Sequence, residues 1–244
     1  MTLPFFVVGA DDLQRDTIEL TGDEGRHAVV VRRTRVGERV LLTDGKGAGA
    51  ECAVVSVSRS ALVAEVRVRR FEPLPEPRLI VVQAIPKGDH AERVVDLLTE
   101  IGVDTIVPWA ASRNVVVWRG EREAKALQRW RSVAHAAAKQ SRRLRFPEVT
   151  ALHDTGEAAE LVASADLALV LHEGASGGLG DVDIPQSGVV ILVVGPEGGV
   201  TEEEASALLA AGARSVRIGP TVLRTSSAGV AAAAALLAQT PRWA

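Results

Sequence analysis

A run of six apolar residues that ends in a glycine-rich turn constrains the fold more than any other part of the chain. Residues 189–194 are Val-Val-Ile-Leu-Val-Val, and Gly-Pro-Glu-Gly-Gly follows at 195–199. A continuous apolar run of this length is typical of a central strand in a parallel sheet, because both faces of such a strand are buried. The sequence therefore predicts an α/β sheet with this turn at the carboxyl end of a central strand, where ligands bind in open sheets.

A helix is expected to begin directly after the turn. Thr201 is a good N-cap, and Glu204 stands three residues later, as in a capping box. Together with Glu202 and Glu203, Glu204 would crowd the first helical turn with carboxylates, which disfavours a bound phosphate. Neither a P-loop nor a dinucleotide-binding glycine pattern is present in the sequence. We therefore expect a ligand with a cationic or neutral head, and a turn without any ligand is the alternative.

A proline-rich segment separates two parts of the chain with different patterns. Residues 1–72 contain short stretches rich in β-branched residues, several with alternating apolar and polar positions, which predicts a small β-barrel. Residues 73–77 contain three prolines and are the expected linker, because proline favours a stiff extended chain. Residues 78–244 alternate strand and helix patterns, which predicts an α/β domain with a mostly parallel sheet covered on both faces.

The expected elements follow from these patterns. In the first part we expect strands at residues 5–8, 17–20, 39–42, 52–57 and 62–68, a hairpin turn at 44–47 and a helical insert at about 23–32. In the second part we expect strands at 79–84, 103–107, 167–171, 189–194 and 215–218, and helices at 91–101, 122–140, 155–163, 201–211 and 226–238.

Composition limits the class of protein. With 47% hydrophobic and 24% charged residues the chain is typical of a globular protein, and no apolar run is long enough to span a bilayer. The start of the chain lacks the features of a signal peptide. The single cysteine, Cys52, excludes an intrachain disulfide, and the histidines show no metal-ligand spacing. We therefore expect a cytoplasmic protein that needs no metal, with Cys52 as a small buried residue.

Charge is unevenly distributed, although the net charge is only −3. Residues 113–145 contain ten Lys and Arg against two Glu, a local balance of +8, whereas residues 148–204 contain twelve Asp and Glu and no Lys or Arg. A local basic field favours a polyanionic partner such as RNA. A solvated basic helix without such a partner is the alternative interpretation.

Several separated motifs carry a family resemblance. They are the turn at 195–199, Arg-Ile-Gly-Pro at 217–220 and Val-Leu-Arg-Thr at 222–225, with further matches at Lys87, 99–103, 106–108, 130–137 and 140–143. Matches also occur in the first part of the chain, at His27 and at Arg32-Arg33 before Gly37, so the resemblance covers nearly the whole chain. In this order the motifs resemble the RsmE family, bacterial methyltransferases of the SPOUT class that modify a uridine at N3 in 16S ribosomal RNA.

The resemblance implies an N-terminal PUA-like β-barrel for RNA and a C-terminal SPOUT-type α/β domain with a deep trefoil knot, which general rules of chain connection would disfavour. It also implies S-adenosyl-L-methionine as cofactor, 16S rRNA of the small ribosomal subunit as partner, and a homodimer formed through the C-terminal domain. The cofactor-binding residues that it implies are Leu171, His172, Glu173, Gly174, Val194, Gly195, Glu197, Gly198, Gly199, Ile218, Gly219, Leu223, Arg224, Thr225 and Ser226.

Arg224 and Glu197 are the candidate catalytic residues. The uracil N3 proton must leave during methyl transfer, and Arg224 would stabilise the resulting anion; pairing with a carboxylate to order its loop is the alternative. Glu197 would act as a base or orient the ammonium group of the cofactor, and accepting hydrogen bonds that order the loop is its alternative. The expected RNA contacts are basic, namely Arg32, Arg33, Arg35, Lys87, Arg142, Arg143 and Arg145.

Two positions depart from the family pattern. Relatives often carry an acidic residue after the Leu-Arg-Thr triplet, where this chain has Ser226-Ser227, and many carry Glu at the position of Lys139. The proton acceptor is therefore not assigned by the resemblance. Ribose 2′-O-methylation by another SPOUT enzyme and a non-catalytic, RNA-binding role in ribosome assembly are the alternative functions.

Overall fold

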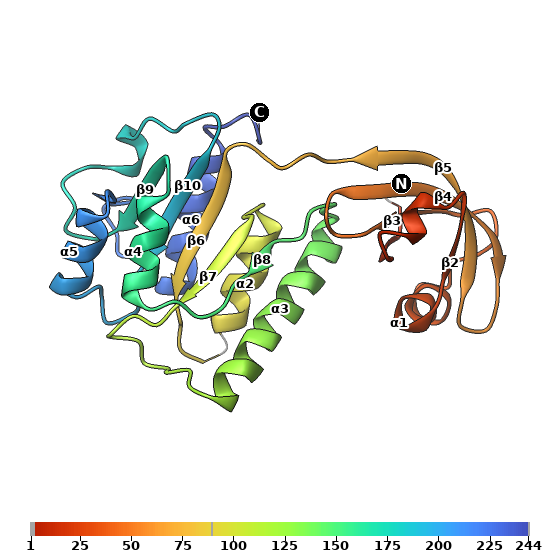
Figure 1. Cartoon of the computed structure of the whole chain (residues 1–244), viewed down its shortest axis with the longest axis horizontal. Coiled ribbons are helices and arrows are strands. Elements are labelled where there is room, and N and C mark those ends of the chain that lie inside the picture. Colours follow the sequence, from red (N-terminus) through yellow and green to blue (C-terminus); the bar gives the residue numbers. More distant parts are fainter. Residues whose placement is uncertain (1–2, 89, 244) are drawn as a thin grey trace. The chain divides into compact units, whose positions relative to one another are not determined.

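The computed structural model describes residues 3–88 and 90–243, which divide into two compact units (Figure 1). The first unit comprises the residues up to Leu74 together with Ala138–Phe146. The second comprises Pro75–Ala137 and the residues from Pro147 onwards. The chain thus leaves the first unit near residue 74 and contributes a second, separate segment to it later in the sequence.

The first unit is built on a five-stranded sheet. Its strands are β1 (Phe5–Val7), β2 (Thr17–Leu20), β3 (Arg39–Thr43), β4 (Ala48–Val57) and β5 (Leu62–Phe71), in the order β1-β3-β4-β5-β2. β1 and β3 are parallel and the other neighbours antiparallel. Two register shifts between β4 and β5 mark irregularities of the kind that bend a sheet. A 3-10 helix (Asp12–Gln14), α1 (Gly22–Arg26) and a π-helix (His27–Val31) complete the unit.

Alternate residues of these strands form the core of the first unit. Val40 and Leu42 of β3 and Ala50, Cys52 and Val54 of β4 are buried, as the alternation predicted. Burial raises the pKa of the Cys52 thiol to about 11, although the charge of Arg69 acts in the opposite direction. The prediction that Cys52 is a small buried residue is confirmed, and its thiol stays protonated at neutral pH.

The later segment of the first unit pairs with the turn between β3 and β4. Phe146 N donates to Gly45 O at 2.8 Å, and Gly47 N donates to Leu144 O at 2.9 Å. These bonds use the predicted hairpin turn as a docking point for a segment about one hundred residues away in sequence. No local pattern in the sequence indicates this pairing.

The second unit is built on a six-stranded parallel sheet. Its strands are β6 (Arg78–Ala84), β7 (Thr105–Trp109), β8 (Glu148–Val149), β9 (Leu167–Leu171), β10 (Val189–Val194) and β11 (Arg214–Val216), in the order β11-β9-β10-β6-β7-β8. All described neighbours in this sheet are parallel, and β10 lies between β9 and β6 as a fully paired strand. The prediction of a central apolar strand is confirmed. Strand order and register alone do not define a knot, so the trefoil knot stays a prediction.

Helices cover both faces of this sheet (Figure 1). Leu79 and Val81 of β6 belong to the core on the face of α2 (His90–Glu100), α3 (Glu121–Ser141) and α6 (Thr225–Leu237). Ile80 and Val82 belong to the core on the face of α4 (Thr155–Ala163) and α5 (Glu202–Ala210). Because successive side chains of a strand point to opposite faces, one apolar run supplies both cores.

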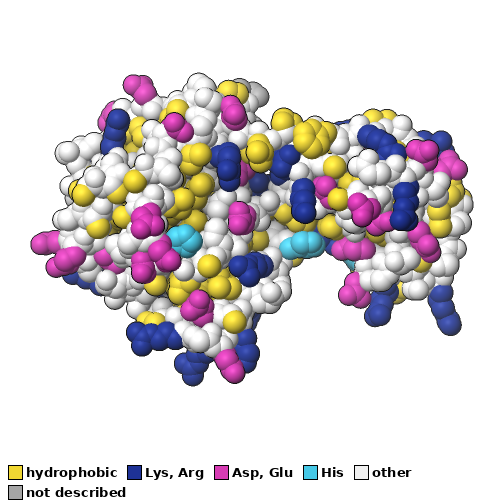
Figure 2. Space-filling model, viewed as in Figure 1, with side chains coloured by type: hydrophobic (Ala, Val, Ile, Leu, Met, Phe, Trp, Pro, Cys, Tyr) yellow, Lys and Arg dark blue, Asp and Glu magenta, His cyan; other side chains and the backbone are white. Residues whose placement is uncertain are grey.

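Charged side chains are segregated on the surface of the second unit. In Figure 2, acidic side chains gather over α4 and α5, and Lys and Arg gather near the start of α3. This distribution matches the acidic region at 148–204 and the basic region at 113–145. Among the described residues, none of the helices combines the length and the apolar character needed to cross a bilayer.

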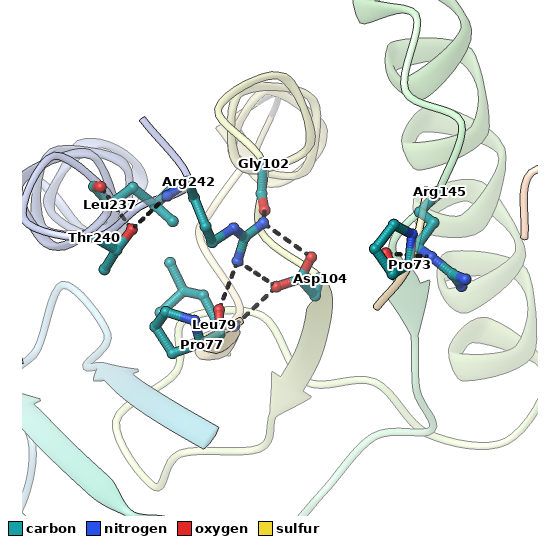
Figure 3. A network of polar contacts seen from close by, with 9 residues as sticks. All are labelled: Pro73, Pro77, Leu79, Gly102, Asp104, Arg145, Leu237, Thr240 and Arg242. Atoms are coloured by element: carbon teal, nitrogen blue, oxygen red, sulfur yellow. Dashed lines mark hydrogen bonds and ion pairs between the residues drawn. The ribbon is translucent and has the colours of Figure 1, made fainter. Parts of the chain in front are cut away.

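An arginine near the end of the chain ties together three segments of the second unit (Figure 3). Arg242 forms a bidentate ion pair with Asp104, with Nη1 to Oδ2 at 2.6 Å and Nη2 to Oδ1 at 3.1 Å. The same guanidinium donates to the carbonyls of Gly102 at 2.6 Å and Pro77 at 3.0 Å. The Arg242 and Asp104 side chains are only 13% and 9% exposed. The segment after α6 is thereby fixed to the residues that precede β6 and β7.

Candidate active site

Three segments at the carboxyl edge of the second sheet line one pocket. They follow β9, β10 and β11, which are consecutive in the order β11-β9-β10, so their ends meet at the same edge. The cavity volume is about 590 Å³, which lies in the range of small-molecule sites. Of the residues expected to bind the cofactor, all line this pocket except Gly174 and Ser226. The structure brings the three loops together, and the binding itself stays a prediction.

The glycine-rich turn after β10 is packed too tightly for side chains. A Cβ on Gly195 would lie 2.6 Å from Val200 Cγ2, and one on Gly198 would lie 2.9 Å from Arg113 Cβ. Gly199 adopts a φ of +76°, and its N–H donates to Pro196 O at 2.9 Å. A positive φ and close packing both require glycine, so backbone rather than side chains forms this wall of the pocket.

The helix after the turn begins with the predicted capping box. Thr201 Oγ1 accepts from Glu204 N at 3.2 Å, and Glu204 Oε2 accepts from Thr201 N at 2.9 Å. Glu204 is buried, and its Oε1 also accepts from Ser112 N at 2.7 Å. Burial by itself raises the pKa of Glu204, but the hydrogen bonds from Thr201 and Ser112 outweigh it and hold the pKa below its ordinary value. One of the three carboxylates is therefore a structural anion, whereas Glu202 and Glu203 are exposed.

Arg113 lines the pocket although no motif in the sequence points to it. It lies in the segment between β7 and α3, and its Nη1 donates to Gly198 O at 3.2 Å. The rule that ligands bind beyond the carboxyl ends of parallel strands applies to β7 as well, and would have pointed to this segment. Sequence reasoning placed Arg113 only at the start of the basic region.

Charged groups of both signs line the pocket. The cations are Arg113, Arg217 and Arg224, and the described carboxylates of the lining belong to Glu173 and Glu197. Glu197 Oε1 also accepts from Lys87 N at 3.3 Å, which links the turn after β10 to the segment after β6. Such a mixture suits a ligand that itself carries both positive and negative groups.

Apolar side chains complete the lining. Leu171 ends β9, Ile218 and Leu223 belong to the segment after β11, and the three side chains would pack against a flat ring. S-Adenosylmethionine has an adenine ring, a sulfonium, an ammonium and a carboxylate, so an apolar wall beside carboxylates and guanidiniums fits its groups. The glycine turn, whose backbone can approach a ligand closely, fits it equally.

Arg224 stands at the N-cap of α6 and its side chain lines the pocket. The described contacts show no side-chain cap from Arg224, whose backbone carbonyl instead accepts from Ala228 N at 2.8 Å. Its guanidinium is thus not used to cap the start of the helix. The two positions that depart from the family pattern, Ser226 and Lys139, do not line the pocket. Lys139 pairs with Glu24 inside the first unit.

The basic residues expected to contact RNA have different local settings. Arg32, Arg33 and Arg35 are exposed on one segment of the first unit, and Lys87 is exposed between β6 and α2. Arg142 is exposed and has a φ of +60° directly after α3, while Arg143 is partly buried.

Arg145 has a structural role as well. Its Nε donates to Glu72 O at 2.7 Å and to Pro73 O at 2.9 Å, and its guanidinium lies 5.5 Å from the centre of the Phe71 ring (Figure 3 shows the Pro73 contact). A cation satisfied in this way holds the end of β5 in place. In the described part of the chain no group of three or more His, Cys, Asp or Glu is arranged to hold a metal.

Comparison with known proteins decides the family. The model of an RNA methyltransferase domain matches residues 72–237, and that of an RNA methyltransferase PUA domain matches residues 20–70. Ribosomal RNA small subunit methyltransferase E of Mycobacterium tuberculosis is 46% identical over 226 residues, which cover 91% of this chain and 86% of that protein. The chain belongs to the ribosomal RNA small subunit methyltransferase E family.

Two further members of the methyltransferase E family are similar to more than nine-tenths of this chain. The Bacillus subtilis protein is 30% identical, with 92% of this chain and 91% of that protein covered. The structure of the Neisseria gonorrhoeae protein bound to S-adenosyl methionine has a TM-score of 0.86 and 30% identity, with 97% of each chain covered. The resemblance inferred from the separated motifs is confirmed.

Proposed function

We propose that this chain transfers a methyl group from S-adenosyl-L-methionine to N3 of a uridine in 16S ribosomal RNA of the small subunit. The observation that carries the proposal is the convergence of the loops after β9, β10 and β11 on one pocket of mixed apolar and charged lining. The relatives are small-subunit ribosomal RNA methyltransferases by name, which supports this RNA as substrate, and the structure of the Neisseria protein bound to S-adenosyl methionine supports the cofactor.

The pocket residues would divide the work of holding the cofactor. Leu171, Ile218 and Leu223 would hold the adenosine part, while Glu173 would attract its positive groups. When bound, the cofactor supplies an electrophilic methyl group on a positively charged sulfur. Holding the reacting atoms in line accounts for much of the rate of such a transfer, and the rigid glycine turn serves that purpose.

Two side chains of the pocket would act on the uracil. Glu197 accepts the proton that leaves N3, and Arg224 stabilises the negative charge that develops on the ring. Neither role depends on residues 226 or 139, because the side chains there do not line the pocket. The Ser226-Ser227 departure therefore does not favour a non-catalytic protein.

The remaining parts of the proposal concern RNA and assembly. Residues 1–72 would form the RNA-binding domain, residues 73–77 the linker, and residues 78–244 a knotted methyltransferase domain that forms a homodimer in the cytoplasm, where ribosomal RNA is found. The match to a PUA domain and the exposure of the basic residues on the first unit support the RNA-binding role. The residues proposed to contact RNA are Arg32, Arg33, Arg35, Lys87, Arg142, Arg143 and Arg145. Sedimentation equilibrium of the purified chain tests the dimer, and a monomer at micromolar concentration would contradict it.

The decisive experiment uses small ribosomal subunits that lack the modification. They are incubated with the protein and S-adenosylmethionine labelled in the methyl group, and the RNA is then copied by reverse transcriptase. Methylation at N3 blocks Watson–Crick pairing, so we expect label in 16S RNA and an arrest at one uridine. Label without arrest would contradict N3 as the site and favour 2′-O-methylation, and absence of label would contradict the enzymatic function.

A further inference from the structure

Arg113 is a cation of the pocket that the proposed function does not yet use. We propose that its guanidinium binds an anionic oxygen group of a ligand, either the carboxylate of the cofactor's methionine part or a phosphate of the RNA beside the target nucleotide. The proposal rests on the proposed function and adds a specific contact to it.

The segment that carries Arg113 is fixed on both sides of this residue. On one side, Ser112 N donates to the buried carboxylate of Glu204 at 2.7 Å. On the other side, Asn114 Nδ2 donates to Trp109 O at 2.9 Å, and Asn114 N donates to Ala111 O at 3.0 Å. A backbone held in this way loses little further freedom when the side chain that it carries binds a ligand.

Within residues 3–88 and 90–243, the guanidinium retains donors that no described contact occupies. An arginine side chain has five N–H donors, and among the described contacts the Arg113 side chain forms one hydrogen bond, from Nη1 to Gly198 O at 3.2 Å. No carboxylate in the described part of the chain forms an ion pair with it, in contrast to Arg242. The planar fork of arginine matches carboxylate and phosphate oxygens, so an anionic group in the pocket is its fitting partner.

The position of Arg113 relative to the other pocket charges supports this assignment. Glu197 and Gly198 are adjacent in the glycine turn, and Arg113 contacts Gly198. A cation and a carboxylate therefore flank the same turn. An amino-acid group carries an ammonium and a carboxylate on one carbon, and a nucleotide carries its phosphates beside the base, so either ligand would present an anion near this turn.

A purely structural role for Arg113 makes a different prediction. If Arg113 only braces the turn through Gly198, its removal would distort the pocket and weaken every ligand alike. Direct contact with an anionic group would weaken only those ligands that carry the group. Ligand pairs with and without the anion separate the two possibilities.

The first arm of the test measures cofactor binding by calorimetry. S-Adenosylhomocysteine contains the amino-acid carboxylate, and 5′-methylthioadenosine lacks it. If the carboxylate is the partner, Arg113→Ala should lower the affinity for S-adenosylhomocysteine by about 10- to 100-fold, because a charge-assisted hydrogen bond is lost. The affinity for 5′-methylthioadenosine should be unchanged. Arg113→Lys should recover part of the affinity. Arg119→Ala is the matched control, since Arg119 lies on the same connecting segment, is exposed and does not line the pocket.

The second arm measures RNA binding at saturating S-adenosylhomocysteine over a range of salt concentrations. If a phosphate is the partner, Arg113→Ala should weaken RNA binding and lower the slope of log affinity against log salt by about 0.7 to 0.9. The proposal would be overturned, with the proposed function intact, if the affinities for both nucleosides fell equally and the salt dependence of RNA binding did not change. It would likewise be overturned if neither the affinities nor the salt dependence changed. Wild-type protein that binds neither nucleoside would contradict both.

Discussion

At the scale of single residues, Glu204 shows how one carboxylate can shape a pocket without lining it. It caps its own helix through Thr201 and accepts from Ser112 in the segment after β7. Thr155 Oγ1 at the start of α4 approaches the same oxygen at 3.4 Å. Three segments distant in sequence thus depend on one ionised group, which holds Arg113 beside the glycine turn.

Replacing Glu204 by Gln should destabilise the protein at neutral pH. The carboxylate accepts from Thr201 N with one oxygen and from Ser112 N with the other, but the amide of Gln has only one oxygen. We therefore expect the free energy of unfolding to fall by about 1–3 kcal/mol. Urea denaturation at pH 7 measures the loss. Glu202→Gln on the same helical turn is the control, because Glu202 is exposed. Equal stability of wild type and Glu204→Gln would contradict the structural role.

The same variant should reveal a pH dependence. Because the pKa of Glu204 in the folded protein lies below its ordinary value of 4.5, the unfolded chain binds the proton more readily. The stabilisation by the carboxylate is therefore present above about pH 4.5 and is lost as the pH falls through the folded value. The difference in stability between wild type and variant should shrink on acidification, and a difference that grows at low pH would contradict the direction of the shift.

Arg224 should affect the chemical step more than cofactor binding. Its positive charge is placed to stabilise an anion that develops on the uracil during the reaction, so Arg224→Ala should lower kcat by about 100-fold. We expect the affinity for S-adenosylhomocysteine to change by less than about 3-fold, because the interaction is formed in the transition state. Arg224 makes no side-chain cap, so the start of α6 should survive the substitution. Steady-state kinetics with saturating RNA would contradict the role if kcat were unchanged.

The residue scale also shows what local sequence can predict about the site. The turn at 195–199 could be identified because glycine and the capping residues after it have local requirements that appear as motifs, whereas the loop at 222–225 was identified by its resemblance to a family motif. Arg113 belongs to no motif; only the place of its segment after β7 points to it, and its contact with the turn after β10 is a property of the sheet. Ser226 was expected in the pocket and does not line it, although its neighbours Arg224 and Thr225 do.

At the scale of elements, strongly periodic segments were predictable and short or long-range ones were not. The strands at 17–20, 167–171 and 189–194 and the helix at 155–163 have the bounds that apolar patterns predicted. β8 has only two residues and pairs with β7 at the edge of the sheet, so it is too short to show an apolar pattern in the sequence. The segment after α3 illustrates the other limit, because Leu144 and Phe146 dock on the turn between β3 and β4 through contacts far apart in sequence.

The end of α3 provides a test of RNA binding at this scale. Replacing Arg142 and Arg143 by Ala should weaken RNA binding and lower the salt slope by up to about 0.7 to 0.9 for each phosphate contact, with cofactor affinity unchanged. Arg142→Gly is the companion variant, because glycine suits the positive φ at this position and removes the charge without strain. If the salt slope is the same in all variants, these residues do not lie on the RNA face.

At the scale of the whole molecule, Arg242 should contribute strongly to stability. It is nearly buried, pairs with Asp104 through two bonds and satisfies the carbonyls of Gly102 and Pro77. Removing one partner of such a pair leaves a charge in a poorly hydrated place, so Arg242→Ala should lower the free energy of unfolding by about 3–5 kcal/mol. Urea denaturation measures it, with the exposed Arg214 replaced by Ala as control. A loss equal to that of the control would show that the pair contributes little.

The division of the chain into units shows the limit of sequence reasoning at the largest scale. Composition and prolines indicate a change of pattern near residues 73–77, and the first compact unit does end its first segment at Leu74. The return of Ala138–Phe146 to that unit depends on backbone hydrogen bonds to residues near the hairpin turn. Backbone bonds can be formed by almost any residue, and the side chains that also hold this segment, Lys139 and Arg145, contact residues far away in the sequence, so no local pattern indicates the return.

The pocket has a consequence for the motions of the second unit. Its walls come from segments that follow different strands at the edge of the sheet, and only a few hydrogen bonds, such as His172 N to Val216 O and Arg113 Nη1 to Gly198 O, join one segment to another among the described contacts. A ligand seated among them acts as a reversible crosslink, and its binding free energy is added to the cost of opening any one of them. Amide hydrogen exchange in residues 171–173, 194–200 and 216–225 should therefore slow together as the ligand concentration rises, although these stretches are distant in the chain.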